Sequence, residues 1–326
     1  MTQLSLYASV TGCSNIISVE VQESFSAITA TATVECDTTT LNLGDEITID
    51  IGYASDHGVV HKGFVKKITR TRPENTFTIE SADVLIRSVD YFIAADDPEH
   101  PFQRNNITSL NLVRDLLALA GITNVTTVEP GPAILTWGTN EDGARFNLQT
   151  VADAVRFIAD MSGNHLFYDR DADLVQFQAR RPYVFDGDVA TLTFTDTGAS
   201  RNIIDCRYES GTDKTRNVCK IYGRGDITAR KRADNPYLVV DQAVVIAHEL
   251  ISSSSVAQQI ADYNLELLNR LTETYTITLE GDHNIAARLI ADLTESFSGA
   301  SGRDVFLYAV SHFLNENYTV QVTAIP

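Results

Sequence analysis

Histidines, cysteines and paired carboxylates are the side chains through which this chain could do chemistry, and their spacing matches no known catalytic motif. His248 is followed by Glu249, but no second histidine stands four residues after the first, so the HExxH zinc motif is absent. The nucleophile motif GxSxG is absent as well. The stretch 223–226, Gly-Arg-Gly-Asp, lacks the length and the Lys-Ser/Thr ending of a phosphate loop. The sequence therefore predicts no catalytic, cofactor-binding or metal-binding residue and no enzyme.

The remaining histidines and acid pairs are better explained as structural or solvated groups. The seven histidines are scattered singly, and His312 at the end of a strand is expected to be a hydrogen-bonded structural residue, not a base. The acid pairs Asp96-Asp97 and Glu141-Asp142 fall in turns, where solvated charge is the usual state. Two carboxylates from distant segments could still form a glycosidase site, which spacing along the chain does not reveal.

Four cysteines, Cys13, Cys36, Cys206 and Cys219, show neither CxxC pairing nor a histidine at metal-ligand spacing. We expect buried free thiols. If residues 202–222 form a hairpin that turns at 211–214, Cys206 and Cys219 lie opposite one another, and the geometry allows a disulfide. In a reducing compartment no such bond is expected.

Residues 1–97 have the pattern of an antiparallel β-module. Apolar and polar residues alternate over several short runs, including 17–21, 30–34 and 47–53, and turn signals separate the runs. This spacing predicts a sandwich or barrel of short strands. The Pro-rich and acidic stretch 96–101 then interrupts the pattern, and we place a domain boundary there.

Residues 98–182 change to the helical period and predict a small α/β domain. One helix is expected from a cap at Thr108 or Ser109 to Gly121, and a second from Thr150 to Gly163. A hairpin over 165–178 follows, with an acidic turn at 169–173. Two helices and a hairpin make a unit of about 80 residues.

Residues 183–326 return to alternation and predict a second β-module. One long helix, about 254–271, interrupts the strands, and its apolar stripe is expected to face the core. The end of the chain predicts a hairpin with its turn at Asn315–Asn317. That hairpin, 305–310 and 318–321, matches an earlier one at 63–68 and 77–80, so the two ends look like copies of one module. The predicted fold class is mainly β with an α+β insertion: two related antiparallel β-barrel modules plus a small helix-containing α/β domain.

The charge is strongly negative and unevenly placed. The net charge of −18 divides into −8 for residues 1–97, −3 for 98–182 and −7 for 183–326. Basic residues gather in two stretches, five at Lys62–Arg72 and seven at Lys214–Arg232. A basic nucleic-acid groove is therefore not expected. The start of the chain has no signal-peptide pattern and no apolar run is long enough to cross a bilayer, so we expect a protein kept in a cytoplasm, without a membrane segment.

Taken together, these segments resemble the bacteriophage tail baseplate hub family, which includes the phage late control protein D group and the central hub of contractile tails. The resemblance spans almost the whole chain. It is carried by LGDEITIDIGY (43–53) with GFVKKI (63–68), TSLNLVRDLLALAGI (108–122), SGNHLFYDRDADLVQFQ (162–178), and VAQQIADYNLELLNRLTETYTITLEG (256–281) with the closing YAVSHFLNENYTVQV. The chain departs from the family at 281–304, where an Ala-rich run looks partly helical.

The resemblance implies a structural protein of the virion tail baseplate, assembled in the host cytoplasm. It implies a homotrimer whose six barrels meet the sixfold tail tube protein and whose threefold face meets the central spike protein, together with other baseplate proteins. DNA would pass through the lumen without specific binding, and an acidic lumen would repel it. No cofactor is implied. The basic stretches Lys62–Arg72 and Lys214–Arg232 would then lie at contacts between subunits or with other tail proteins.

Two alternatives remain from the sequence. A tail-associated cell-wall hydrolase would need a catalytic constellation that no motif reveals. A carbohydrate-binding protein for host attachment would need exposed aromatic platforms, and the chain has a single tryptophan, Trp137.

Overall fold

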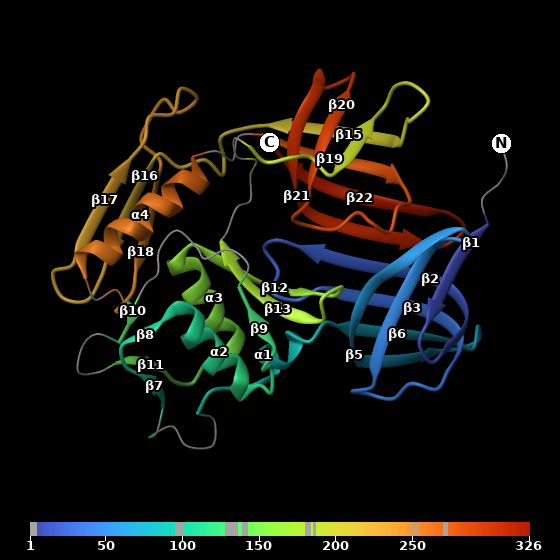
Figure 1. Cartoon of the computed structure of the whole chain (residues 1–326), viewed down its shortest axis with the longest axis horizontal. Helices are drawn as coiled ribbons and strands as arrows, with labels where there is room; N and C mark the ends of the chain where they lie inside the picture. Colours follow the sequence, from blue (N-terminus) through green and yellow to red (C-terminus); the bar gives the residue numbers. More distant parts are fainter. Residues whose placement is uncertain are drawn as a thin grey trace.

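The structure is a computed structural model that describes residues 5–94, 99, 101–127, 136–138, 143–179, 184, 187–249, 251, 253–269 and 273–326. The fold is mainly β, as predicted. Figure 1 shows two groups of strands side by side, blue for the start of the chain and red for its end, with a green helix-containing unit and an orange unit beside them. The predicted boundary at 96–101 lies mostly outside the described residues.

The first strand module contains six strands in the spatial order β1-β4-β5-β6-β3-β2. Neighbouring strands in this order are antiparallel, and β2 returns beside β1 after a tight turn, in which Gly12 has φ 71°. The alternation of the sequence becomes alternation of burial, because successive side chains of a strand point to opposite faces. The strands are β1 (Leu6–Val10), β2 (Cys13–Ser24), β3 (Thr31–Thr39), β4 (Glu46–Tyr53), β5 (Asp56–Thr71) and β6 (Thr76–Ala82).

The middle unit contains the helices that the sequence predicts. Helix α2 (Ser109–Leu119) ends before Gly121, and α3 (Val151–Ser162) ends at Gly163 in the left-handed conformation. The Thr150 hydroxyl caps α3 by accepting a hydrogen bond from the Asp153 N–H at 3.0 Å. The predicted hairpin is present as β12 (Asn164–Asp169) and β13 (Leu174–Ala179). The other elements are α1 (Ile86–Asp90), β7 (Phe102–Arg104), β8 (Ile107–Thr108), β9 (Val125–Thr126), β10 (Thr136–Trp137) and β11 (Ala144–Phe146).

The second strand module also has six strands, in the spatial order β14-β20-β21-β22-β19-β15. The predicted closing hairpin is confirmed by β21 and β22. The Ala-rich run 281–304 is not helical: it contains β20, in which alternate residues are buried, and the start of β21. The strands are β14 (Leu192–Thr195), β15 (Ile203–Ser210), β19 (Glu273–Glu280), β20 (Ile290–Glu295), β21 (Ala300–Leu314) and β22 (Tyr318–Ile325).

A separate unit is inserted between β15 and β19. It contains the predicted long helix α4 (Ser254–Leu268) and also a three-stranded sheet of β16 (Val218–Tyr222), β17 (Thr228–Arg232) and β18 (Ala243–Ala247). Residues 270–272, at the end of the predicted helix, lie outside the described residues. The predicted hairpin over 202–222 is wrong, because β15 pairs with β19 whereas β16 pairs with β17 and β18.

The two strand modules have the same order. Strands β1 to β6 correspond in chain order to β14, β15, β19, β20, β21 and β22, and the inserted unit falls between the second and third strands of the second module. In both modules one long strand, β5 or β21, pairs through its first half with one neighbour and through its second half with another. The modules differ at one position, since β1 is antiparallel to β4 whereas β14 is parallel to β20.

Local geometry repeats at the residue level. A bulge interrupts β5 between Val65 and Lys67, and a bulge interrupts β21 between Leu307 and Ala309. Gly44 (φ 86°) donates its N–H to the Val65 carbonyl at 2.9 Å, and Arg288 (φ 77°) donates to the Leu307 carbonyl at 2.8 Å. Both residues adopt the left-handed conformation, which favours glycine. The match between the two modules therefore extends beyond strand order to an unusual backbone position.

Two hydrophobic cores hold the chain together. One core joins both strand modules, from Val19 and Val34 to Val310 and Val322. The other core joins the middle unit to the inserted unit, with α2 and α3 on one side and the buried residues Ala257, Ile260, Ala261 and Leu265 of α4 on the other. The buried face of α4 confirms that the helix packs inward.

Candidate functional site: the junction between the strand modules

The two modules join through one strand ladder. Strand β2 pairs antiparallel with β21, from Val19 opposite Leu314 to Ser24 opposite Ala309. The Phe25 N–H extends the ladder with a 2.8 Å bond to the Tyr308 carbonyl. This ladder makes one 12-stranded sheet from two six-stranded modules, as Figure 1 shows where the blue and red strands meet.

A buried ionic cluster locks the junction. Glu23 on β2 forms an ion pair with Arg288, accepts the Ala287 N–H at 3.3 Å, and lies 3.7 Å from Arg170 of the middle unit. The Glu23 and Arg288 side chains are only 13% and 14% exposed. Burial raises the pKa of Glu23, but the two guanidinium groups and the hydrogen bonds outweigh burial and lower it below its usual range. Glu23 is therefore ionised and ties three parts of the chain together.

The neighbouring groups are also structural. Arg170 donates to the Val60 carbonyl at 2.9 Å, and the Lys62 ammonium donates to the Arg170 carbonyl at 2.6 Å. The buried Asp83 carboxylate accepts from the N–H groups of Ala30 (2.7 Å) and Leu85 (2.9 Å), and burial raises its pKa to about 7. These contacts brace the first module against the middle unit.

Two buried histidines flank the cluster in the neutral form. Burial lowers the pKa of both His61 and His312 to about 4. His312 shares a 2.8 Å hydrogen bond with the Tyr318 hydroxyl and a 2.9 Å bond with the Ile285 carbonyl. The prediction that His312 is a hydrogen-bonded structural residue agrees with this geometry.

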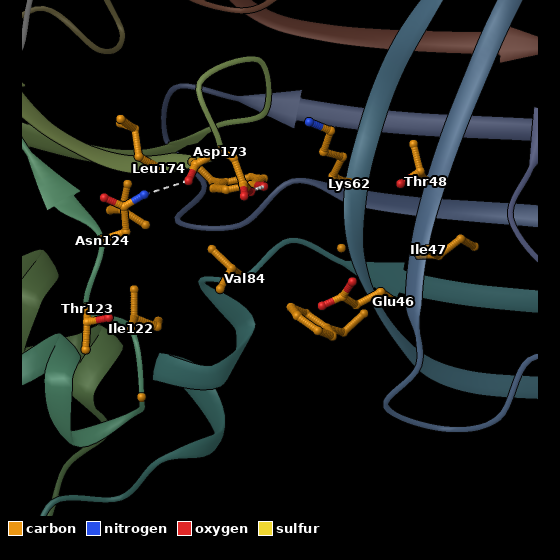
Figure 2. A pocket seen from close by; sticks show the side chains of 15 residues that line it. Glu46, Ile47, Thr48, Lys62, Val84, Ile122, Thr123, Asn124, Asp173 and Leu174 are labelled. Atoms are coloured by element: carbon orange, nitrogen blue, oxygen red, sulfur yellow. Dashed lines mark hydrogen bonds between the residues drawn. The ribbon is translucent and has the colours of Figure 1, made fainter.

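A cavity lies between the first strand module and the middle unit. It has a volume of about 440 Å³ and a polar lining that includes Glu46, Lys62, Tyr168 and Asp173. Figure 2 shows Glu46 of β4 and Lys62 of β5 on one side and Asp173, in the turn between β12 and β13, on the other, where Asn124 donates to the Asp173 carbonyl at 2.8 Å. Within the described ranges no three His, Cys, Asp or Glu side chains are grouped to hold a metal ion.

The cysteines and histidines that drew attention in the sequence are separated by the fold. Cys206 lies opposite Ile277 in the large sheet, whereas Cys219 lies opposite Lys231 in the inserted unit, and all four cysteines are free. His248 packs on Phe157 with ring centroids 3.9 Å apart. The 223–226 stretch forms the turn between β16 and β17. The acid pairs at 96–97 and 141–142 lie outside the described residues.

Four residues of the two basic stretches form ion pairs within the chain. In the first stretch Lys66 pairs with Asp90, and Lys67 pairs with Glu80 at 2.6 Å. In the second, the pairs are Lys231 with Asp262 and Arg232 with Asp241, each at 3.1 Å. All these pairs are well exposed, so they leave both stretches available to solvent.

The described tryptophan is not part of an exposed aromatic surface. Trp137 is buried and donates to the Ser109 hydroxyl at 2.8 Å. Three exposed apolar side chains lie on the loop between β17 and β18, where Tyr237, Val239 and Val240 are 68%, 100% and 67% exposed. Among the described helices none has the length and apolar character that spanning a membrane requires.

Sequence reasoning missed the ionic cluster. Glu23, Arg170 and Arg288 are 118 or more positions apart along the chain, and no local pattern links them. One of the three, Arg288, has an unusual backbone, because its φ is positive. The corresponding residue of the first module is Gly44.

Comparison with solved structures identifies the fold. The chain is similar to a tail protein from Neisseria meningitidis MC58 (TM-score 0.75, 14% identity, 99% of this chain and 97% of that chain). It is similar to the 43 kDa tail protein of prophage MuSo2 from Shewanella oneidensis (TM-score 0.70, 14% identity, 98% of each chain). The E. coli c3393 protein, a type VI secretion component described as similar to the T4 tail proteins gp27 and gp5, matches with a TM-score of 0.63, 9% identity and coverage of 98% and 76%.

No protein-family model matches the chain, and no curated protein matches it. The comparisons therefore show that the chain has the fold of phage tail proteins and of a type VI secretion component, at sequence identities where only the fold is carried over.

Proposed function

We propose that this protein is a structural hub in the tail baseplate of a phage or a phage-like particle. The observation that carries the proposal is the pair of six-stranded modules with the same strand order, joined side by side in one sheet. The fold likeness to phage tail proteins over nearly the full length supports it. A doubled module is what an adaptor between sixfold and threefold structures needs, because three copies supply six similar units.

In this proposal the chain divides into an N-terminal barrel at 1–97, a small α/β domain at 98–182 and a second barrel at 183–326. Three chains form a ring whose six barrels stack on the tail tube and whose threefold face holds the central spike. The acidic barrel regions face the lumen, where negative charge lets DNA pass without binding. The protein acts as a virion component assembled in the host cytoplasm, and it carries no enzymatic activity.

The exposed loop with Tyr237, Val239 and Val240 is a candidate contact for another baseplate protein. It lies on the inserted unit, away from the junction of the two strand modules (Figure 1). Isolated exposed apolar residues are common, but three on one loop form a patch that a partner would cover.

Electron-microscope class averages of the purified protein test the proposal. We expect ring-shaped particles with six inner lobes and threefold outer projections, around a channel wide enough for duplex DNA. Particles of a single chain, with only two modules, or rings without a central channel, would contradict it.

A further inference from the structure

Two strand edges of the large sheet are open within the described part of the chain. Strand β15 pairs only with β19, and the second half of β5, residues 66–71, pairs only with β6. Most side chains along both edges are exposed, including Lys66, Lys67, Arg207 and Glu209. An open edge presents unpaired N–H and C=O groups that another strand can use.

The strands that correspond to these two edges are already paired with one another within the chain. By strand order β15 occupies the place of β2, and β5 occupies the place of β21. The β2–β21 ladder therefore shows how an edge of the β15 type and an edge of the β5 type fit together. In the second module β15 is an open edge that corresponds to β2. In the first module β5 is an open edge that corresponds to β21.

The matching bulges give the alignment of the two modules. With Val65 aligned to Leu307, Ile68 corresponds to Val310. Across the first module the paired residues run from Ile68 through Ile79 and Val34 to Val19.

Across the second module the paired residues run from Val310 through Val322 and Ile277 to Cys206. Cys206 therefore corresponds to Val19, and each neighbour along β15 corresponds to a neighbour along β2. This correspondence determines which residue of β15 would lie opposite which residue of β5.

We propose that β15 of one copy pairs antiparallel with residues 66–71 of β5 in a second copy, in the register of the β2–β21 ladder. Because Glu20 faces Phe313 and Gln22 faces Ser311 within the chain, the new ladder places particular residues opposite one another. The predicted pairs are Arg207 with Thr71, Tyr208 with Arg70, Glu209 with Thr69, and Ser210 with Ile68. This inference rests on the proposed ring, because repeating the junction from chain to chain closes the ring at six modules.

The side chains along the two edges suit this contact. Ile68, Cys206 and Tyr208 are half-buried apolar residues at the margin of the barrel core, and a neighbouring strand would cover them. Their counterparts in the existing ladder, Val310, Val19 and Val21, are buried. The predicted pair also places the Arg70 guanidinium near the Tyr208 ring, where a cation–π contact is favourable.

Charge also favours the pairing. Residues 66–72 carry four basic side chains and no acidic one, whereas residues 203–213 carry three acids, Asp205, Glu209 and Asp213, against one base. Opposite charges steer encounter and fix register more than they add affinity. The new ladder lacks the buried ion pair of the existing one, since Glu23 and Arg288 correspond to Ser210 and Gly44. No unpaired buried charge is therefore left on either edge before assembly.

Disulfide cross-linking tests the register. Thr71→Cys with Arg207→Cys is the matched variant, and Thr71→Cys with Glu209→Cys is the control, shifted by two residues. Both carry Cys206→Ser so that the native thiol does not compete. Residues directly opposite on antiparallel strands have the Cβ separation that a disulfide needs, whereas diagonal neighbours do not. Under mild oxidation we expect the matched variant to lose its monomer band on a non-reducing gel and the control to keep it.

The outcomes separate the pairing from the ring. Cross-linked bands that stop at three chains support both. A ladder that continues beyond three chains keeps the strand pairing but overturns the proposed trimer. A particle of three chains in which the matched variant does not cross-link, or in which only the shifted control does, overturns the pairing and leaves the hub proposal intact. A chain that stays monomeric without cross-links overturns both.

Discussion

The two strand modules use equivalent edges in different ways. On β2 and β21 the edges are joined, their apolar residues are buried, and the ion pair of Glu23 with Arg288 closes the contact. On β15 and on residues 66–71 of β5 the edges are open, and the positions that correspond to the ion pair hold Ser210 and Gly44. The joined edges lie permanently within one chain, so they can contain a buried charge pair whose partner is always present.

The difference shows how two modules with the same strand order can differ at their edges. A buried charge without its partner costs several kcal/mol, so an edge that must wait for another chain is safer with neutral or exposed polar groups. An open edge with Lys and Arg side chains also resists unwanted strand pairing. In the proposed assembly the first contact stabilises the chain and the second joins one chain to the next, and the following variants test this contrast.

The largest effect is expected at the ionic cluster. Glu23→Gln removes the negative charge from Arg288 and Arg170, and we expect it to lower the free energy of unfolding by about 3 kcal/mol. Ser210→Ala, at the corresponding position of the second module, should change it by less than about 0.5 kcal/mol. Denaturant unfolding measures both. Equal effects at the two positions would show that the junctions do not differ in this way.

The pH dependence of stability should differ between variants of His312 and of Arg70, which occupy corresponding positions of the two modules. The pKa of His312 is lowered to about 4, so below pH 6.5 the unfolded chain takes up a proton that the folded chain excludes. Its contribution to stability is complete above pH 6.5 and is lost as the pH falls towards 4. The stability advantage of the native protein over His312→Gln should therefore shrink by about 2 kcal/mol between pH 7 and pH 5.

Arg70→Gln is the control, because an arginine does not titrate in this range. Its difference from the native protein should stay constant between pH 7 and pH 5 in the same denaturant series. A constant difference for His312→Gln as well would mean that this imidazole is not buried in the neutral form.

Reversing the charges of the open β5 edge should affect assembly more than folding. Lys66→Glu with Lys67→Glu is expected to weaken self-association about tenfold, because it puts acids on the edge that is proposed to pair with the acidic β15. Both lysine ion pairs are exposed, so the unfolding free energy should change little. Sedimentation compares the double variant with Arg104→Glu, which breaks an exposed pair in the middle unit. If both dissociate equally, the basic edge has no special role in assembly.

The smallest effect is expected at the repeated backbone position. Gly44→Ala should cost about 1 kcal/mol, since a Cβ there meets no atom within 4 Å but the φ of 86° disfavours a side chain. Gly211→Ala also adds a Cβ in open space, without a positive φ, and should be nearly neutral. The difference in thermal unfolding midpoint between the two variants measures the cost of a side chain in the left-handed backbone conformation. An unchanged midpoint for Gly44→Ala would remove strain as the reason for glycine at this position.

Local signals in the sequence predicted much of the fold. The caps at Thr150 and Gly163 gave the limits of α3, and alternation gave most strands of both modules. The failures have physical causes. Residues 202–222 contain two strands close in sequence, yet β15 pairs with the distant β19, whereas β16 pairs with β17 and β18, which follow it. Strand β17 was missed since its sequence, TARKR, is polar and its residues are mostly exposed.

The candidate site could be predicted only in outline. The repeated hairpin at 63–80 and 305–321 pointed to the duplicated module. The junction itself depends on long-range pairing of β2 with β21 and on three charged residues far apart in the sequence, for which periodicity gives no signal. The inserted unit likewise shares its core with the middle unit through contacts that no local pattern reveals.

Light scattering of the purified protein in solution measures how many chains join through their open edges. If equivalent open edges join one chain to the next in a closed ring, the particle should have three times the chain mass of 35.8 kDa. A mass of one, two or four chains at concentrations where tail proteins assemble would contradict the account.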